Sequence, residues 1–412
     1  MSSADSKISA FSEKISAGDK PVGSLSATIK EISSKYFVDP WSLSDTRRNF
    51  GGGYDADELP AFDYMGQDFL FVNRETECKQ LVTRFGEMDS IRGYGNLDQL
   101  KRNLLAPLCI GLSGIGKTRF AHVAVTSLVR KATGLSSPTL EQMLESSNTV
   151  TEEIWPDDRS HDKLLRELIF ASHESRNIRI TMYDFCGATE RTVEVEIIIA
   201  VLAQWMKQRK LRPELKNLKD GSIVNKLKAE LGIFRWAPFL SLTFCEVVNF
   251  IIEQSSRAGE IEHTPALIIN LDEAQNLRGS LQQVLEIISR PLFAVNCRVF
   301  FTITGICTSH FREAIVQSNV SLQPIILPIL SETHLSTILG NIFGVEVNQL
   351  PENVVNLTKS LGGVSRLLEY FLSFVAKKST ATTVEQIWEW PCTTNNKSLM
   401  DIILSVRSHL TG

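Results

Sequence analysis

The stretch LCIGLSGIGKTRFAHVAV, residues 108–125, interrupts an apolar run with three glycines and then places a lysine and a threonine at the start of an amphipathic segment. Its centre, GLSGIGKT, has the G-x-x-x-x-G-K-[ST] spacing of a phosphate-binding loop. Glycines allow backbone N–H groups to approach phosphate oxygens closely. A helix that starts at Thr118 adds the positive end of its dipole. The stretch therefore predicts a strand, a phosphate loop and a helix, in that order.

Two side chains of this loop have specific expected roles. Lys117 would reach the β- and γ-phosphates of a nucleotide, and Thr118 would supply a hydroxyl oxygen to Mg²⁺. A glycine-rich turn that happens to precede a lysine is the alternative, but the flanking apolar strand and amphipathic helix favour the phosphate loop. The residues predicted to bind the nucleotide are Gly111, Leu112, Ser113, Gly114, Ile115, Gly116, Lys117, Thr118 and Arg119.

A second candidate half-site ends the apolar run ALIINLDEAQ, residues 266–275. Asp272 is placed to hold Mg²⁺, directly or through water, together with Thr118. The adjacent Glu273 would polarise the attacking water as a general base. An acidic cap at the start of a helix is the alternative interpretation. Combined with the upstream phosphate loop, the acidic pair predicts an ATPase site that uses ATP or ADP and Mg²⁺.

The next apolar segment, VFFTITG, carries two threonines. In nucleotide-binding folds with a phosphate loop, a polar residue at the carboxyl end of this strand faces the γ-phosphate. Thr304 is the first candidate and Thr302 the second. The ordinary preference of threonine for strands explains both residues equally well.

Three arginines are candidate cations for the bound phosphates. Arg366 lies in LGGVSRLLEYF, at the start of an expected helix, where its side chain would reach the nucleotide. A solvated arginine is an equally good interpretation. Arg312 and Arg290 are further candidates, which would act within the chain or across a subunit interface.

Strand-like and helix-like segments alternate through the middle of the chain, which predicts a parallel sheet. The strands are continuous apolar runs, so helices should cover both faces. Beyond residue 331 the strand patterns fade and helical patterns dominate. Strands are expected at 106–112, 177–185, 265–274, 297–305 and 322–330, and helices at 118–131, 193–208, 244–256 and 280–290.

This pattern divides the chain into three parts. Residues 1–66 are expected to be a flexible or weakly helical tail and an irregular segment, 67–330 an α/β core, and 331–412 a small helical lid domain. A length of 412 residues fits two or three domains. The net charge of −4 argues against a protein that coats nucleic acid by charge alone. A local basic run at 207–219, with six Lys and Arg, would bind an acidic partner or nucleic acid, or is a solvated loop.

The sequence carries no pattern of a secreted or membrane protein. Its seven cysteines are scattered, never form C-x-x-C, and fit a reducing compartment. The first 20 residues contain no apolar segment of a signal peptide. No run approaches the roughly 20 apolar residues that span a bilayer. We expect an intracellular protein, cytoplasmic or nuclear, with no membrane association.

Taken together, these motifs resemble the AAA+/STAND division of P-loop ATPases, which have a glutamate after the metal-binding aspartate. FVNRETECKQL resembles the segment that precedes the phosphate loop and packs near the adenine. LPILSETHLSTIL resembles the last core strand and first lid helix. LGGVSRLLEYF resembles the G-G-x-P-R-x-L-E element of the lid, whose arginine is called sensor 2. Here Ser365 replaces the usual proline.

Residues 69–375 also resemble the NTPase module of Crinkler and retrotransposon-hot-spot type proteins. The resemblance is carried by the R-E-x-E segment, the wide spacing to NIRITMYDF, the LDEAQ box and the G-G-V-x-R element. It implies switching that depends on ADP and ATP, often coupled to nucleic acid or to immune and effector signalling.

Three hypotheses for function stay open from the sequence. The first is an ATPase whose hydrolysis moves the lid. The second is a nucleotide-gated interaction module that hydrolyses little, with an unknown protein or a nucleic acid as partner. The third is a decayed domain without nucleotide binding. The intact LDE favours the first, and the sequence leaves open whether the chain forms a homo-oligomer.

Overall fold

The chain contains a five-stranded, all-parallel sheet with the order β2-β3-β4-β1-β5. Its strands are β1 (Leu105–Ile110), β2 (Asn177–Thr181), β3 (Ala266–Asp272), β4 (Arg298–Gly305) and β5 (Ser321–Ile326). The computed structural model describes residues 21–38, 74–91, 105–112, 114–135, 138–158, 161–173, 176–181, 190–208, 212–215, 220–234, 242–255, 265–275, 277, 281–293, 298–306, 321–343, 346, 348, 355–356, 359, 362–365 and 367–368. The predicted parallel α/β sheet is confirmed.

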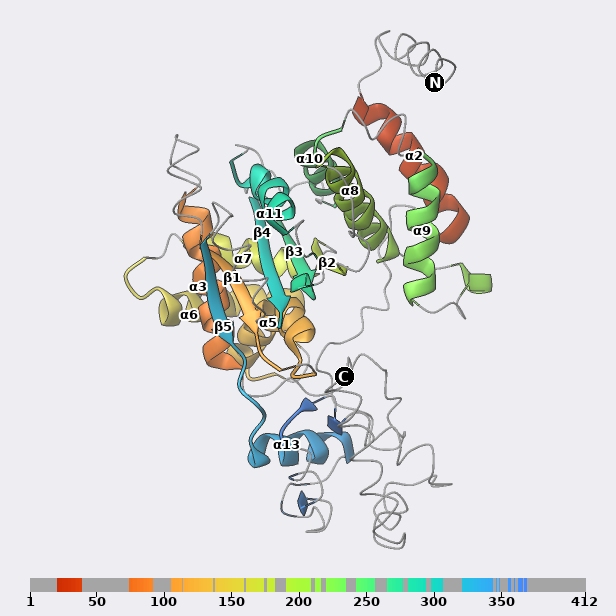
Figure 1. Cartoon of the computed structure of the whole chain (residues 1–412). Helices are drawn as coiled ribbons and strands as arrows, with labels where there is room; N and C mark the ends of the chain where they lie inside the picture. The colour runs from red at the N-terminus through yellow and green to blue at the C-terminus, as the bar shows by residue number, and fades with distance from the viewer. Residues whose placement is uncertain are drawn as a thin grey trace, which may run out of the picture.

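Helices in two groups cover this sheet, as the ribbon drawing shows (Figure 1). One group contacts β1, β3 and β4 and consists of α3 (Glu75–Ile91), α5 (Lys117–Thr133) and α7 (His161–His173), with α6 (Leu140–Ile154) packed on α5 and α7. The other contacts β2, β3 and β4 and consists of α8 (Glu190–Lys207), α10 (Phe244–Ser255), α11 (Leu281–Ser289) and the short helix η4 (Arg290–Phe293). All seven residues of β3 are buried between these layers.

The order of the strands separates the two predicted halves of the site. The strand before the phosphate loop, β1, pairs with β4 and β5, whereas the strand that ends at Asp272, β3, pairs with β2 and β4. Strand β4 therefore lies between them and ends beside both. In open parallel sheets, ligands bind outside the carboxyl ends of the strands, where the connections diverge. The edge formed by β1, β4 and β3 is the place to look for a site.

Strand β5 differs from the expected core strand. It is an edge strand, and most of its residues are partly or fully exposed. Ile326 is 66% exposed, and Ile329, in the segment after the strand, is 53% exposed. The expectation that helices cover both faces is therefore wrong for β5. An edge strand tolerates Pro324, which cannot donate a backbone hydrogen bond.

Within the N-terminal region, residues 21–38 contain a helix that is packed against the chain, whereas a flexible or weakly helical tail was expected. Helix α2 (Pro21–Tyr36) lies beside α9 (Asp220–Phe234) in Figure 1. Its residues Leu25, Ile29 and Ile32 follow one face of the helix and are completely buried. Lys35 and Tyr36 both donate hydrogen bonds to Glu230, at 2.9 and 3.2 Å. A surface rich in Ser, Lys and Ala hid this narrow apolar stripe from sequence analysis.

Beyond β5 the chain continues into α13 (Glu332–Phe343), which lies below the carboxyl edge of the sheet in Figure 1. Residues 369–412 are outside the described part of the chain, so the helical lid over 331–412 stays a prediction. None of the described helices is both long enough and apolar enough to cross a membrane.

The docking of α2 gives a stability prediction. Replacing the buried Ile29 by alanine removes apolar contacts and leaves a cavity, so we expect Ile29→Ala to lower the free energy of unfolding by about 2–5 kcal/mol. Urea denaturation followed by circular dichroism measures the loss. The exposed neighbour Lys30 provides the control, because Lys30→Ala should change stability by less than about 0.5 kcal/mol. Equal effects of the two substitutions would contradict the packing of α2.

Candidate functional site

A stripe of polar side chains crosses the buried sheet beneath helix α5. Arg179 of β2 is in register with Asn270 of β3, and Asn270 is in register with Thr302 of β4. Residues two apart on a strand point to the same face. Six polar residues therefore share the face that α5 covers: Asn177, Arg179, Asn270, Asp272, Thr302 and Thr304.

The lower part of this stripe is a chain of amide hydrogen bonds. Asn270 donates from Nδ2 to Oδ1 of Asn177 at 2.6 Å, and Asn177 donates from Nδ2 to the carbonyl of His122 in α5 at 2.8 Å. Both asparagines are buried. Buried amides are costly without partners, so this chain fixes the separation of β2, β3 and α5.

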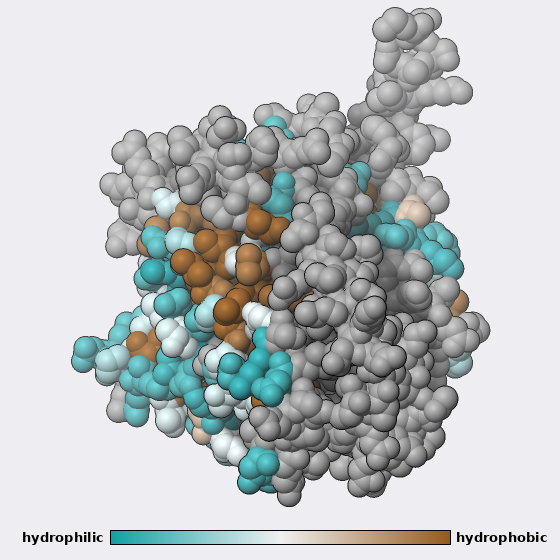
Figure 2. All heavy atoms as spheres, turned by 60° about the horizontal axis from the view of Figure 1, so that its bottom comes forward, coloured by the Kyte–Doolittle hydropathy of each residue, from teal (hydrophilic) through white to brown (hydrophobic). Residues whose placement is uncertain are grey.

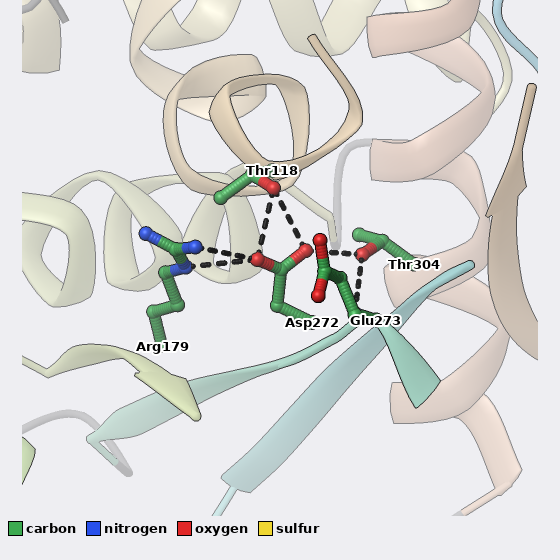
Figure 3. A network of polar contacts seen from close by, with 5 residues as sticks. All are labelled: Thr118, Arg179, Asp272, Glu273 and Thr304. Atoms are coloured by element: carbon green, nitrogen blue, oxygen red, sulfur yellow. Dashed lines mark hydrogen bonds and ion pairs between the residues drawn. The ribbon is translucent and has the colours of Figure 1, made fainter. Parts of the chain in front are cut away.

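The upper part of the stripe converges on the carboxylate of Asp272 (Figure 3). Thr118 Oγ1, from the first turn of α5, lies 2.8 and 2.9 Å from the two carboxylate oxygens. Thr304 Oγ1 donates to Oδ1 at 2.5 Å. Arg179 donates to Oδ2 from Nε at 3.0 Å and from Nη2 at 2.6 Å. One carboxylate thus connects α5, β2, β3 and β4.

Glu273 lies beside Asp272 but takes part in the network differently (Figure 3). Its φ of 55° turns the chain sharply at the end of β3. Its backbone N–H donates to Thr304 Oγ1 at 3.3 Å, so Thr304 contacts both acidic residues. Its carboxylate oxygen Oε2 is buried and has no hydrogen-bond partner among the described residues. A buried acceptor without a partner is suited to receive a hydrogen bond from a ligand or from water.

Two glycines of the predicted phosphate loop adopt backbone conformations that other residues rarely adopt. Gly114 and Gly116 have φ values of 77° and 93°, in the left-handed region that side chains other than glycine rarely adopt. Gly116 is also the residue that precedes α5, so the loop leads directly into the helix N-terminus. Lys117 folds back over the loop, and its Nζ donates to the carbonyls of Gly111 and Leu112 at 3.0 and 2.8 Å.

Two residues that are remote in sequence donate hydrogen bonds to backbone carbonyls of the loop. Arg74, just before α3, is 5% exposed and donates to the carbonyls of Pro328 and, at 3.3 Å, Ile115. Its burial lowers the pKa of the guanidinium. Ser365 donates from Oγ to the carbonyl of Gly114 at 2.9 Å. The segment around residue 365 therefore contacts the loop directly, and Arg74 links the loop to the segment after β5.

The remaining predicted site residues are divided between described and other parts of the chain. Ser113, Arg312 and Arg366 lie outside the described residues. Arg290 hydrogen-bonds Glu194 at 3.1 Å and is not part of the Asp272 network. Thr302 is buried two residues before Thr304, on the same face of β4. Its Oγ1 has no partner among the described residues. In the loop and the first turn of α5, Leu112 is exposed, Ile115 is buried, and Arg119 is half-buried.

Sequence analysis missed Arg179. The only signal was a charged residue inside the otherwise apolar strand NIRIT, flanked by the buried Ile178 and Ile180. Its partner was not predictable, because the sequence does not reveal that β2 and β3 are neighbours. The register in fact places Arg179 diagonally opposite Asp272.

The surface at this edge of the sheet is partly apolar. Four exposed large apolar side chains end or follow strands here: Leu112, Ile306, Ile326 and Ile329. Figure 2 views the molecule with this edge turned forward and shows apolar residues gathered on the described surface. Apolar surroundings lower the local dielectric constant and strengthen the interactions of nearby charges.

The donor set at Asp272 fits a magnesium ion. Magnesium prefers oxygen ligands and is usually held by one or two carboxylates together with substrate phosphates. The Asp272 carboxylate and the Thr118 hydroxyl provide such oxygens within hydrogen-bond distance of each other. No group of three or more His, Cys, Asp or Glu side chains suited to a metal occurs in the described ranges, so a metal cage built from protein ligands alone is not found there.

Comparisons with known proteins add little to this picture. No protein-family model matches the sequence, and no curated protein matches it. Among solved structures, a chain from a structure of Drosophila ORC bound to DNA is similar, with a TM-score of 0.31 and 12% sequence identity. The similarity covers 91% of this chain and 73% of that chain. Function therefore has to be inferred from the geometry of the site.

Gly362 and Gly363 form a matched pair that tests the contact beside the loop. Both have positive φ values, but a Cβ on Gly363 would lie 2.1 Å from the carbonyl oxygen of Leu330, whereas a Cβ on Gly362 meets nothing within 4 Å. The N–H of Leu330 donates to the carbonyl of Gly363. We expect Gly363→Ala to abolish hydrogen-exchange protection of the Leu330 amide, while Gly362→Ala retains it. Equal protection in both variants would refute this contact.

His122 gives the site region a pH dependence. Burial, and then the positive charges of Arg179 and Lys207, lower the pKa of His122 to about 4. The unfolded chain therefore binds more protons between about pH 6.5 and 4, and stability falls as the pH drops through that window. We expect the free energy of unfolding of the wild type to fall more steeply from pH 7 to 5 than that of His122→Gln. Urea midpoints at both pH values measure this, and parallel slopes would contradict it.

Proposed function

We propose that the chain binds ATP with Mg²⁺ at the edge formed by β1, β4 and β3, and hydrolyses it. The observation that carries the proposal is the Asp272 carboxylate, which accepts hydrogen bonds from Thr118 at the start of the phosphate-loop helix and from Thr304 at the end of β4. These contacts support the proposal that the G-x-x-x-x-G-K-[ST] loop and the acidic strand end form one site. Phosphoryl transfer requires both a loop that binds the phosphates and a carboxylate that holds the metal.

Phosphate binding would use the loop backbone and Lys117. The glycines with positive φ allow backbone N–H groups to surround phosphate oxygens, and the N-terminus of α5 favours their negative charge. Lys117 donates to two carbonyls of its own loop, and these contacts keep its ammonium group at the loop. We infer that Nζ exchanges these carbonyls for β- and γ-phosphate oxygens when ATP binds.

Thr118 and Asp272 would hold the metal. Bound Mg²⁺ neutralises charge on the phosphates as the bond to the leaving group breaks. Because the carboxylate of Asp272 already accepts several hydrogen bonds, it is poorly placed to take a proton from water. Its expected role is therefore to orient the Thr118 hydroxyl and to hold the metal.

Glu273 is the better candidate for the general base. Its buried Oε2 has no partner among the described residues and would accept a hydrogen bond from the attacking water. The water oxygen attacks the γ-phosphorus, the bond from that phosphorus to the β–γ bridging oxygen breaks, and the water proton passes to Glu273. The products are ADP and inorganic phosphate. Thr304 contacts both acidic residues and would keep them aligned with each other.

A nucleotide-gated switch with little hydrolysis is the second candidate, and one observation favours it. Ser365 contacts the carbonyl of Gly114, so a change in loop conformation reaches the segment at 362–365 directly. Under this alternative, nucleotide binding repositions the predicted lid, including Arg366, and a protein or nucleic-acid partner reads its position. An arginine supplied by a partner or a second copy would raise a low rate of hydrolysis.

The phosphate loop gives the first test of the proposal. We expect Lys117→Ala to weaken binding of a fluorescent ATP analogue by at least about tenfold, because the loop loses its only lysine. Fluorescence titration measures the affinity, and exposed Lys30→Ala is the control. Unchanged affinity in Lys117→Ala would refute nucleotide binding at this loop, whereas no binding by the wild type would leave the decayed-domain hypothesis.

Glu273→Gln separates the enzyme from the switch. We expect it to retain ATP binding and to lower single-turnover phosphate release by about 10²-fold or more, since the amide cannot accept the proton. Glu253→Gln, at an exposed position on α10, is the control and should release phosphate at the wild-type rate. Wild-type release no faster than that of Glu273→Gln would exclude the ATPase and favour the switch.

A further inference from the structure

The carboxylate of Asp272 is compensated entirely by the protein. Oδ1 accepts from Thr304, Oδ2 accepts from two nitrogens of Arg179, and the single hydroxyl hydrogen of Thr118 is shared between the two oxygens. A carboxylate oxygen has about two good acceptor positions, so these contacts use nearly all of its capacity. A metal ion cannot bind Asp272 closely unless one of these donors leaves.

Of the three donors, Arg179 is the one suited to leave. The two threonine hydroxyls come from short side chains fixed to buried elements. The Arg179 side chain is long and 28% exposed, whereas that of Asp272 is 3% exposed. A side chain that is already partly exposed can turn outward and bring its guanidinium into water, so its departure does not leave an unpaired charge buried.

Charge makes the arginine and a metal mutually exclusive. The ion pair of Arg179 and Asp272 is formally neutral, and the N–O distance is 2.6 Å. A divalent cation at the same carboxylate would repel the guanidinium, because the two positive charges would lie side by side. Without the metal, however, the buried Asp272 would be uncompensated if Arg179 were absent.

We propose that Arg179 is a built-in counter-cation of Asp272 that Mg²⁺ displaces when the magnesium nucleotide binds. This inference rests on the proposed function. It makes Arg179 a positioning residue that sets the magnesium requirement: the empty site stays neutral and ordered, and metal binding must compete with an arginine. Removal of that competition should make the metal bind more tightly.

The test is a magnesium titration of nucleotide binding. A fluorescent, non-hydrolysable ATP analogue is held at fixed concentration, and the Mg²⁺ concentration at half-maximal binding is compared between variants. We expect Arg179→Gln, which keeps a neutral donor, to lower this midpoint by about tenfold or more. Arg179→Lys keeps the charge but not the forked donor, so its midpoint should fall by a smaller factor.

A second Arg–Asp pair provides the matched control. Arg298 at the start of β4 lies 3.0 Å from Asp89, and both side chains are mostly buried. Arg298→Gln removes a comparable ion pair that is not part of the Asp272 network, so the magnesium midpoint should not change. A direct measurement uses Mn²⁺ alone: electron paramagnetic resonance should show tighter Mn²⁺ binding to nucleotide-free Arg179→Gln than to the wild type.

The outcomes distinguish this inference from the proposed function. Nucleotide binding that does not depend on Lys117 would overturn both. Intact nucleotide binding with an unchanged or raised magnesium midpoint in Arg179→Gln would overturn only the inference. If nucleotide binding without metal is weakened in Arg179→Gln as much as in Lys117→Ala, then Arg179 is a phosphate ligand. That result would also overturn the inference. If Arg179→Gln does not fold, an unchanged midpoint in Arg179→Lys decides against the proposal.

Discussion

A buried carboxylate is the constraint on which the rest of this site depends. Removing the Asp272 charge from water is unfavourable unless the protein supplies donors and an opposite charge. Those groups come from α5, β2 and β4, so compensation of one charge requires four elements to take fixed relative positions. The asparagine chain beneath it imposes the same spacing on β2, β3 and α5. The same hydrogen bonds therefore fix both the geometry of the site and the packing of the sheet.

Most of the sheet could be predicted because its signals are local. Strands β1, β3 and β4 are apolar runs buried on both faces, and the loop before α5 is marked by glycines at fixed spacing. The choice of Thr304 before Thr302 also followed from local reasoning, since the later residue lies nearer the end of the strand. In the structure Thr304 contacts Asp272 and Glu273, whereas Thr302 lies deeper.

What could not be predicted depends on pairing between distant segments. The role of Arg179 can be inferred only once β2 is known to lie next to β3, and a single sequence does not give that strand order. Ser365 and Arg74 bind carbonyls, which have no signature in the sequence. Helix α2 was hidden because its docking face has three buried apolar side chains, and their effect on composition is small. In each case tertiary contacts decided a role that local pattern left open.

The exposed edge of the sheet has a consequence for self-association. An edge strand presents backbone groups that can pair with a strand of another molecule. Strand β5 has only six residues, and its Pro324 removes one of the donors that such a partner would need. Addition of a second sheet to this edge is therefore disfavoured. Copies of this chain that assemble are therefore expected to use surfaces other than the β5 edge.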